Sequence, residues 1–380
     1  MDNAPQVRYK TTIKQQWRRL RANIRNLFFL LCTRSKPHSK KQNNDTNKQD
    51  SILILRTDGI GDYLLFRNFL HEIKTAYPTH SITLLGNIAW QALSETLESE
   101  SINNFIWLDR NRFHKNPFYA LFFLRKIQSH IYNLFINPLQ SRDAISETLA
   151  KHVFATYKCA SEGDCVNLPV PKKQEADLIY TQLFPSKQSV VFEFYRNQDF
   201  FETLLGKKLF TKLYIESNQQ RSLAKNKYTV LFIGANAAYR KWHIKNFKKV
   251  ADYLIATYKM NILICGGKED IENSKVLQQM IEISTNNTAI KVKNLVGQTT
   301  LINLLEIIQN AKLLISNETG CAHLGAIMQI PTIVISNGNH LGRFTPYPKN
   351  LSSNYYPVYH PSIMSHLENN KIYQELCKKI

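Results

Sequence analysis

The stretch ILILRTDGIGDYLLFRNFL, residues 52–70, joins an unbroken aliphatic run to two glycines, an acid and a new apolar pattern. The run at residues 52–55 predicts a strand that is buried on both faces of a parallel sheet. Gly59 and Gly61 permit a sharp turn, because glycine adopts backbone angles that other residues resist. From Tyr63 onward the apolar residues recur at helical spacing, so the whole stretch predicts a strand, a glycine turn and a helix.

Asp62 falls at or near the start of the predicted helix, and two interpretations of it are open. It is either an N-cap whose oxygen accepts free backbone N–H groups, or a catalytic carboxylate at the carboxyl edge of a sheet. The local sequence favours the cap. A dinucleotide-binding loop is excluded, because Leu64 takes the place of the last glycine of GxGxxG and an acid beside the turn would repel a pyrophosphate. The chain also lacks the G-x-x-x-x-G-K-[ST] pattern of a P-loop.

Composition indicates a globular protein with an acidic partner. The 380 residues are enough for two cores of ordinary size, and the net charge is +20. Such a charge suits nucleic acid, a phosphorylated glycan or an anionic membrane, and composition does not choose among them. The sequence has no RNP, zinc or helix-turn-helix signature, so nucleic-acid binding is disfavoured. The six cysteines show no metal-binding or redox spacing, which predicts reduced thiols in a cytoplasmic protein.

Residues 1–50 differ from the rest of the chain. Six apolar residues fall on one helical face and basic residues crowd the remainder, which predicts a basic amphipathic helix within residues 1–35 that lies on an anionic membrane. The alternative is a tail that packs on its own domain or is disordered. The longest apolar run, residues 27–32, is far shorter than the roughly 20 residues that span a bilayer. Residues 37–50 are polar enough to form a linker.

From Ser51 onward, expected strands and helices alternate in two series, which predicts parallel sheets with helices on their faces. The first series has expected strands at 52–55, 81–85, 105–108 and 131–136, and expected helices at 89–98, 117–128 and 143–154. The second has expected strands at 228–233, 261–265, 312–316 and 332–335, and expected helices at 243–258, 270–284 and 300–310. We therefore predict an α/β fold with domains at 51–215 and 228–345, a linker at 216–227 and a C-terminal tail at 346–380. Residues 155–225 gave no clear pattern.

Two turns of the second series are suited to an anionic ligand. A strand ends at Gly234, small residues follow, and Arg240 and Lys241 precede the next helix. Small residues permit close approach and the cations suit a phosphate, although a basic loop is more often merely solvated. Residues 264–270, ICGGKED, form a strand, a Gly-Gly turn and an acidic helix start. An acid there accepts from ribose hydroxyls or complements the helix dipole.

The polar turn Asn317 to Gly320 follows another expected strand. Its backbone N–H groups and hydroxyl lie where α/β sheets bind ligands. His323, on the short helix that follows, is either a hydrogen-bonded core histidine, which is the commoner case, or a contact to phosphate or sugar. Catalysis by Cys321 is disfavoured, because no paired base is visible.

Five motifs in order resemble glycosyltransferase family 9, the lipopolysaccharide heptosyltransferases. They are R-x-D-x-x-G-D-x-x-L after the first strand, G-A-x(5)-K-W, GGKED, NLVGQTTL at 294–301 and SNETGCAHLGAIMQIPT at 316–332. The resemblance covers about residues 51–345. It implies the GT-B architecture, in which two Rossmann-like domains face each other across a cleft. The N-terminal domain then handles the acceptor and the C-terminal domain the nucleotide-sugar donor, usually ADP-heptose.

The resemblance also implies roles for individual residues. Asp62 matches the general base of direct, inverting displacement, within an acceptor-side loop that contains Gly59 and Gly61. Lys241 matches a lysine associated with the donor phosphates. The remaining donor-side positions are Gly234, Glu269 with Asp270 as its neighbouring alternative, Glu318, Thr319, Gly320 and His323. Enzymes of this type need neither a metal nor a cofactor besides the donor substrate.

Departures from the family pattern leave alternatives open. Glu318 replaces the usual aspartate, and the basic N-terminal extension lies outside the pattern. We expect a transferase that adds heptose to a lipopolysaccharide core or related anionic glycolipid, peripheral on the cytoplasmic face of the inner membrane. The alternatives are a GT-B enzyme with a UDP- or GDP-linked sugar, an epimerase included, and a non-catalytic binding protein of the same fold.

Overall fold

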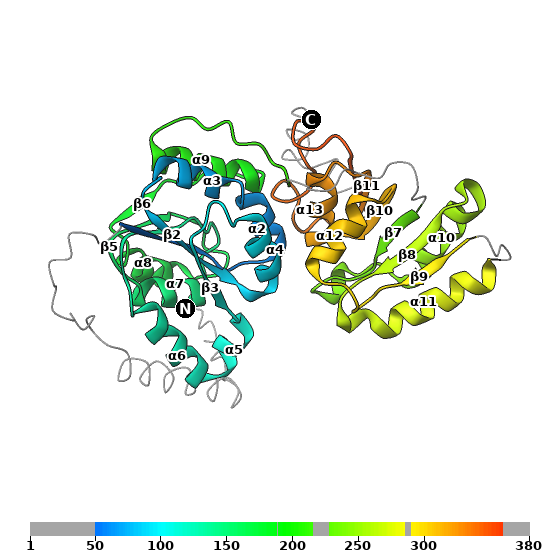
Figure 1. Cartoon of the computed structure of the whole chain (residues 1–380), viewed down its shortest axis with the longest axis horizontal. Helices are drawn as coiled ribbons and strands as arrows, with labels where there is room; N and C mark the ends of the chain where they lie inside the picture. The colour runs from blue at the N-terminus through cyan, green and yellow to red at the C-terminus, as the bar shows by residue number, and fades with distance from the viewer. Residues whose placement is uncertain (1–49, 188, 216–227, 286–289, 360–380) are drawn as a thin grey trace, which may run out of the picture.

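The computed structural model describes residues 50–187, 189–215, 228–285 and 290–359. It contains two six-stranded sheets, one in each half of the described chain, with helices on both faces (Figure 1). Every strand pair within the sheets is parallel. The predicted α/β class with two parallel sheets is therefore confirmed.

The first sheet has the strand order β3-β2-β1-β4-β5-β6. Its strands are β1 (Ser51–Arg56), β2 (Ser81–Asn87), β3 (Asn104–Leu108), β4 (Ile131–Asn137), β5 (Phe154–Ser161) and β6 (Gln182–Phe184). Its helices are α2 (Ile60–Phe66), α3 (Phe69–Ala76), α4 (Gln91–Leu97), α5 (Arg110–Lys115), α6 (Pro117–Ile127), α7 (Ala144–His152), α8 (Val170–Asp177) and α9 (Glu193–Leu205).

The second sheet repeats this topology, in the order β12-β11-β10-β7-β8-β9. Its strands are β7 (Tyr228–Phe232), β8 (Asn261–Cys265), β9 (Val292–Asn294), β10 (Leu313–Asn317), β11 (Thr332–Ser336) and β12 (Tyr355–Tyr359). Its helices are α10 (Ile244–Tyr258), α11 (Ile271–Ser284), α12 (Leu301–Gln309) and α13 (Gly320–Ile327), with short 3-10 turns at Ala238–Arg240 and Lys268–Asp270.

The burial of β1 explains its unbroken aliphatic sequence. Ile52 and Ile54 belong to the core beneath α2, α3 and α9, whereas Leu53 and Leu55 belong to the core on the opposite face, beneath α6 and α7. Neighbouring side chains of a strand point to opposite faces, so a strand covered on both sides is apolar at every position. The central strand is thereby fixed in register between two helical layers.

Two segments differ from the sequence-based expectation. The unassigned residues 155–225 include β6, α8 and α9, and α9 packs Phe194 and Phe201 against Phe69 of α3. The second sheet also extends beyond residue 345, because β12 lies within the predicted tail and pairs with β11. The expected linker 216–227 and the amphipathic segment 1–35 lie outside the described residues, and the domain boundaries that depend on them stay predictions.

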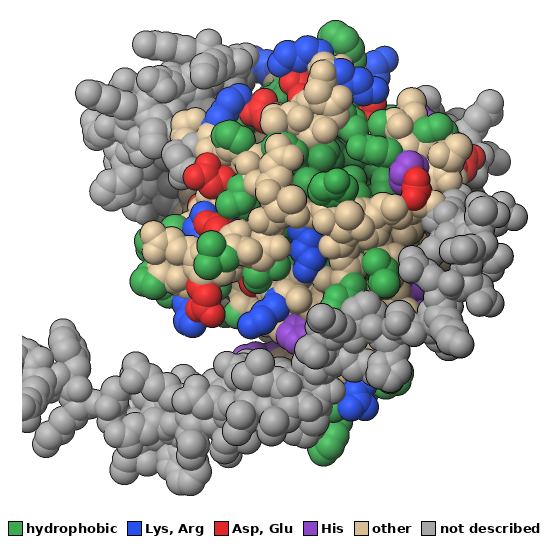
Figure 2. Space-filling model, turned by 90° about the vertical axis from the view of Figure 1, so that its left-hand side faces the viewer, with side chains coloured by type: hydrophobic (Ala, Val, Ile, Leu, Met, Phe, Trp, Pro, Cys, Tyr) green, Lys and Arg blue, Asp and Glu red, His purple; other side chains and the backbone are tan. Residues whose placement is uncertain are grey.

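The two halves meet through helices that follow their central strands. Helix α13 packs on α2, and α12 packs on α4. The contact is close, because a Cβ at Gly320 would lie 3.0 Å from the side chain of Ile60. In the described ranges, no helix is both long and apolar enough to cross a bilayer. The face of the first half in Figure 2 carries basic, acidic and hydrophobic side chains interspersed.

Candidate active site

A cleft of about 1130 Å³ lies between the two halves. The loops after β1 and β4 line its first wall, and the loops after β7 and β10 line the second. In both sheets these two strands are neighbours, at the point where the order of the strands reverses. Doubly wound sheets bind ligands at such points, outside the carboxyl ends of the strands. The topology thus brings two ligand-binding edges together across one space.

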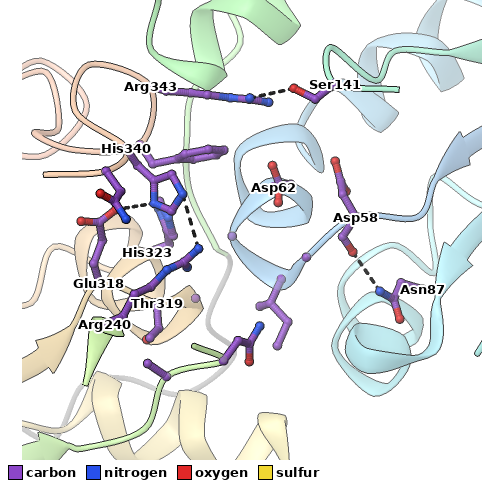
Figure 3. Close-up of a pocket in the computed structure, with 18 of the residues that line it drawn as sticks. Asp58, Asp62, Asn87, Ser141, Arg240, Glu318, Thr319, His323, His340 and Arg343 are labelled. Carbon is purple, nitrogen blue, oxygen red and sulfur yellow. Dashed lines mark hydrogen bonds and ion pairs between the residues drawn. The ribbon is translucent and has the colours of Figure 1, made fainter. Parts of the chain in front are cut away.

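Asp62 lies on the first wall of the cleft (Figure 3). It is the third residue of α2 rather than its N-cap, which is Gly59, and no side chain caps this helix. The N-cap interpretation is therefore wrong, because the helix already begins at Ile60, and Gly61 and Asp62 both lie within its first turn. The side chain of Asp62 keeps 23% of its surface exposed. Burial raises the pKa of the Asp62 carboxyl above its usual range, and the nearby charge of Glu193 raises it further.

The buried guanidinium of Arg56 holds the loop that carries Asp62. It donates to the Asp58 carboxylate at 2.9 Å, to the Asn197 side chain at 3.1 Å and to the backbone carbonyl of Asp62 at 3.2 Å. Its distances to the carboxylates of Asp62 and Glu193 are 4.0 and 3.7 Å. Arg56 lowers the pKa of Asp62 and so opposes the effect of burial. The carboxylate is therefore fixed in place beside a cation without a direct hydrogen bond to it.

Glu193 connects the two walls. Its side chain is 1% exposed and accepts a hydrogen bond from Arg343 of the second half at 2.9 Å. Arg343 also donates to the hydroxyl of Ser141 on the first wall at 2.8 Å (Figure 3). The positive charge of Arg343 likewise lowers the pKa of Asp62. A residue of the second half thus acts on a carboxylate of the first half.

The second wall offers an anion site at the start of α13. Thr319 is the N-cap of this helix and Gly320 its first residue, so free backbone N–H groups face the cleft. The Oγ1 atom of Thr319 is buried and has no hydrogen-bond partner among the described residues. Hydroxyl and amide donors in this arrangement suit phosphate oxygens.

The side chain of Glu318 lies beside this anion site, and two hydrogen bonds hold its carboxylate. It accepts from the hydroxyl of Ser336 and lies 2.7 Å from Nδ1 of His340. Although burial opposes ionisation, these two hydrogen bonds lower the pKa of Glu318. The Glu318 side chain, which is longer than the aspartate it replaces in the family pattern, therefore reaches His340 as a carboxylate.

Arg240, one of the two cations that the sequence offered for a phosphate, lines the cleft on this wall. Its guanidinium lies 3.4 Å from Nε2 of His340, whose Nδ1 faces Glu318 (Figure 3). The neighbouring Lys241 is not among the lining residues, and its Nζ forms an ion pair with the buried Asp270 at 2.5 Å. The role of Lys241 as a phosphate ligand stays a prediction, whereas Arg240 lines the cleft.

Gly234 and Glu269 both line the cleft near this cation. A Cβ at Gly234 would lie 2.7 Å from the carboxylate of Asp270, so this position has no room for a side chain. Glu269 is exposed, whereas Asp270 is buried and paired with Lys241. Of the two acids considered for the nucleoside, Glu269 is the one that lines the cleft.

His323 is buried where the two halves meet. Its Nδ1 lies 2.6 Å from the hydroxyl of Tyr347, and burial lowers the pKa of His323 to about 4. A Cβ at Gly61 would lie 2.8 Å from the imidazole ring, which explains the glycine at the second position of α2. The ring also lines the cleft, so His323 is both a buried core residue and part of the wall of the candidate site.

Comparisons with known proteins agree with this geometry. A sequence model of glycosyltransferase family 9 (heptosyltransferase) matches residues 174–369. Two curated relatives are named lipooligosaccharide heptosyltransferase 2, both from Campylobacter jejuni subsp. jejuni. The protein of serotype O:2 is 29% identical over 34% of this chain and 40% of its own length. The protein of serotype O:6 is 25% identical over 42% of this chain and 54% of its own length. The chain thus matches about half the length of these relatives.

Solved structures show the same fold. The E. coli heptosyltransferase WaaC with ADP-2-deoxy-2-fluoro heptose has a TM-score of 0.64 and 18% identity, over 84% of this chain and 99% of that one. A glycosyl transferase family 9 protein from Veillonella parvula has a TM-score of 0.63 and 17% identity, over 84% and 88% of the two chains. These likenesses support the GT-B-like arrangement of the two sheets.

Proposed function

The chain belongs to glycosyltransferase family 9, the heptosyltransferase family, and on that premise we propose that it transfers heptose from ADP-heptose to a lipopolysaccharide or lipooligosaccharide core. One observation supports this proposal most: a carboxylate on one wall of the cleft faces an anion site on the other. Direct displacement needs both, because a base must activate the acceptor while the leaving diphosphate gains charge. The heptosyltransferase relatives and the E. coli complex with an ADP-linked heptose analogue support this choice of sugar and nucleotide.

The proposed reaction proceeds in one displacement with inversion. Asp62 takes the proton of the acceptor hydroxyl as its oxygen attacks the anomeric carbon of the donor. The bond from that carbon to the β-phosphate oxygen breaks, and ADP leaves with the electron pair. A carboxylate whose pKa lies above its usual range is a better proton acceptor, which favours Asp62 for this role.

The donor side stabilises the leaving diphosphate. The N-terminal N–H groups of α13 bind its oxygens together with the hydroxyl of Thr319, which has no hydrogen-bond partner among the described residues. Arg240 supplies a positive charge, and the Glu318–His340 pair holds its guanidinium toward the cleft. Glu269 faces the space left for the nucleoside.

Calorimetric titration with ADP, UDP and GDP, followed by ADP-heptose, tests the donor. We expect selective binding of ADP and ADP-heptose. Preference for UDP or GDP would leave the fold assignment intact and contradict ADP-heptose as the donor. Binding of none of these nucleotides would favour a non-catalytic protein of this family.

We further propose that the enzyme works at the cytoplasmic face of the inner membrane, because a core acceptor is anchored in lipid. The predicted amphipathic helix within residues 1–35 lies outside the described residues and remains part of this proposal. Deletion of residues 1–49 should weaken binding to anionic vesicles. Undiminished binding of the deletion variant would refute an anchoring role for this segment.

A further inference from the structure

Asp58 is the first acid of the R-x-D-x-x-G-D motif and has no role in the proposed displacement. Its side chain is 27% exposed and lines the cleft on the same wall as Asp62, whose side chain is 23% exposed. A Cβ at Gly59 would lie 3.3 Å from Oδ2 of Asp62, so the carboxylate of Asp62 lies over the residue that directly follows Asp58. Figure 3 shows both acids on the wall that faces Arg240 and Glu318. The first wall of the cleft therefore carries two neighbouring carboxyl groups.

Structural roles do not account for both oxygens of the Asp58 carboxyl group. Asp58 precedes Gly59, the N-cap of α2, but no side chain caps this helix. Its Oδ1 accepts a hydrogen bond from the buried Arg56 at 2.9 Å. Arg56 is also held by Asn197 and by the backbone carbonyl of Asp62. Among the described residues, Oδ2 of Asp58 has no hydrogen-bond partner, so this oxygen can accept from a ligand in the cleft.

The segment after β2 fixes the backbone at Asp58. The carbonyl of Asp58 accepts from Nε1 of Trp90 at 3.2 Å and from Nδ2 of Asn87 at 3.1 Å (Figure 3). Trp90 is fully buried and stacks on Tyr63 of α2, with ring centroids 4.4 Å apart. Asp58 is thus held both at its backbone and at Oδ1. A group that is already held in place loses little freedom when a ligand binds, which favours recognition.

The electrostatics around Asp58 indicate which kind of group it can bind. Burial raises the pKa of Asp58 well above its usual range, and the charges of Asp62 and Glu193 raise it further, whereas Arg56 and Arg343 lower it. A hydroxyl that donates to Oδ2 would stabilise the carboxylate, because a hydrogen bond to the charged form favours that form. An anionic group would be repelled by the two neighbouring acids. This part of the wall therefore suits a neutral sugar ring that bears hydroxyl groups.

We propose that Asp58 binds the acceptor sugar: its Oδ2 accepts a hydrogen bond from a second hydroxyl of the ring whose reacting hydroxyl gives its proton to Asp62. This inference deepens the proposed function, on which it rests. Two contacts to one ring fix its orientation, so that a single hydroxyl points to the anomeric carbon of the donor. Asp58 is then a specificity-determining residue, and no bond forms or breaks at its carboxyl group.

Transfer kinetics of the full chain at saturating ADP-heptose test the proposal. The acceptors are a core oligosaccharide and analogues that each lack one hydroxyl beside the reacting one. For the wild type we expect one analogue whose kcat/KM is about tenfold or more below that of the complete acceptor, because it leaves Oδ2 unpaired. Asp58→Ala and Asp58→Asn should use the complete acceptor about tenfold or more less well, and should no longer distinguish it from that analogue. The asparagine can still accept from Arg56, and it then turns an N–H group to the cleft.

Asp177→Asn is the matched control. The side chain of Asp177 is 21% exposed and pairs with the buried Arg142, as that of Asp58 pairs with Arg56, but Asp177 is not among the residues that line the cleft. This variant can lower the melting temperature, and it should distinguish the acceptors as the wild type does.

Three results would overturn the proposal. The wild type could use every analogue as well as the complete acceptor. Asp58→Asn could work as the wild type does with all acceptors, which would show that Asp58 only holds Arg56. Both variants could instead lose the same factor with every acceptor, which would show a general disturbance of the site rather than recognition of one hydroxyl.

The wild-type assay separates this inference from the proposed function. A wild type that transfers heptose, together with Asp58 variants that keep the wild-type discrimination, would contradict the role of Asp58 alone. A wild type that transfers nothing from ADP-heptose would contradict the proposed function, and the role of Asp58 with it. Calorimetry with ADP should give wild-type affinity for both Asp58 variants, because the anion site lies on the opposite wall.

Discussion

Arg343 donates a hydrogen bond to the buried carboxylate of Glu193 across the cleft, at 2.9 Å, and so ties a loop of the second half to helix α9 of the first. The backbone reinforces this link, because the N–H of Glu193 donates to the carbonyl of Arg343 at 2.8 Å. Since Glu193 also lies 3.7 Å from Arg56, the charge network reaches the loop of Asp62. The protonation of the candidate base therefore depends on how the two halves meet.

Arg343→Gln should move the acidic limb of the pH–rate profile to higher pH. Arg343 lowers the pKa of Asp62, so its loss lets the pKa rise, and the active carboxylate is then protonated at higher pH than before. The measurement is kcat/KM as a function of pH. Arg343→Lys keeps the charge and should shift the limb less. An unchanged limb in Arg343→Gln would show that the network does not act on the base.

Asp62→Asn should lower turnover by about a hundredfold or more, because an amide cannot accept the proton of the acceptor hydroxyl. Affinity for ADP should stay near that of the wild type, since Asp62 lies on the wall opposite the anion site. Steady-state kinetics and calorimetry on the same preparation measure the two effects. Normal turnover in the variant would remove Asp62 from the role of base.

Arg240→Ala and Lys241→Ala should differ in what they lose. Arg240 lines the cleft, so its removal should weaken ADP binding about tenfold or more, as expected for a charge-assisted contact. Lys241 pairs with the buried Asp270, so its removal should lower the free energy of unfolding by about 1–3 kcal/mol. Calorimetry and urea unfolding measure these quantities. A larger loss of ADP affinity in Lys241→Ala would restore the lysine as the phosphate ligand.

His323 should make the protein less stable as the pH falls from about 6.5 to 4. Its pKa is lowered to about 4 in the folded chain, so over this range the unfolded chain binds a proton that the folded chain does not. The loss of stability from this group can reach about 3 kcal/mol, and it stops below pH 4 because both states are then protonated. Urea unfolding of His323→Gln should show a flatter dependence on pH. A slope equal to that of the wild type would contradict this assignment.

The fold could be predicted where strands are buried on both faces. The run at residues 52–55 is apolar at every position and its counterparts in the second half are mostly apolar, and each became a central strand. The elements within residues 155–225 were harder to predict, because β6 has only three residues and α8 carries mostly polar ones. Strand β12 was missed because its exposed and buried residues do not follow a simple alternation with polarity.

The site was predicted where a motif marks a turn. Gly61, Asp62 and Thr319 were identified from local patterns and from the family resemblance, and all three line the cleft. Glu193 and Arg343 could not be found in this way, because each lies outside a motif and gains its place from a contact between the halves. The local pattern did not separate Arg240 from Lys241, and the family resemblance selected Lys241. In the structure Lys241 pairs with Asp270, whereas Arg240 lines the cleft.

The most direct test of the central claim is heptose transfer from ADP-heptose to a lipid-linked core acceptor, with release of ADP measured alongside. The account predicts ADP release that depends on the acceptor, a product with inverted anomeric configuration, and loss of both in Asp62→Asn. A wild-type chain that binds ADP-heptose and transfers nothing, or an Asp62→Asn variant that transfers as well as the wild type, would contradict it.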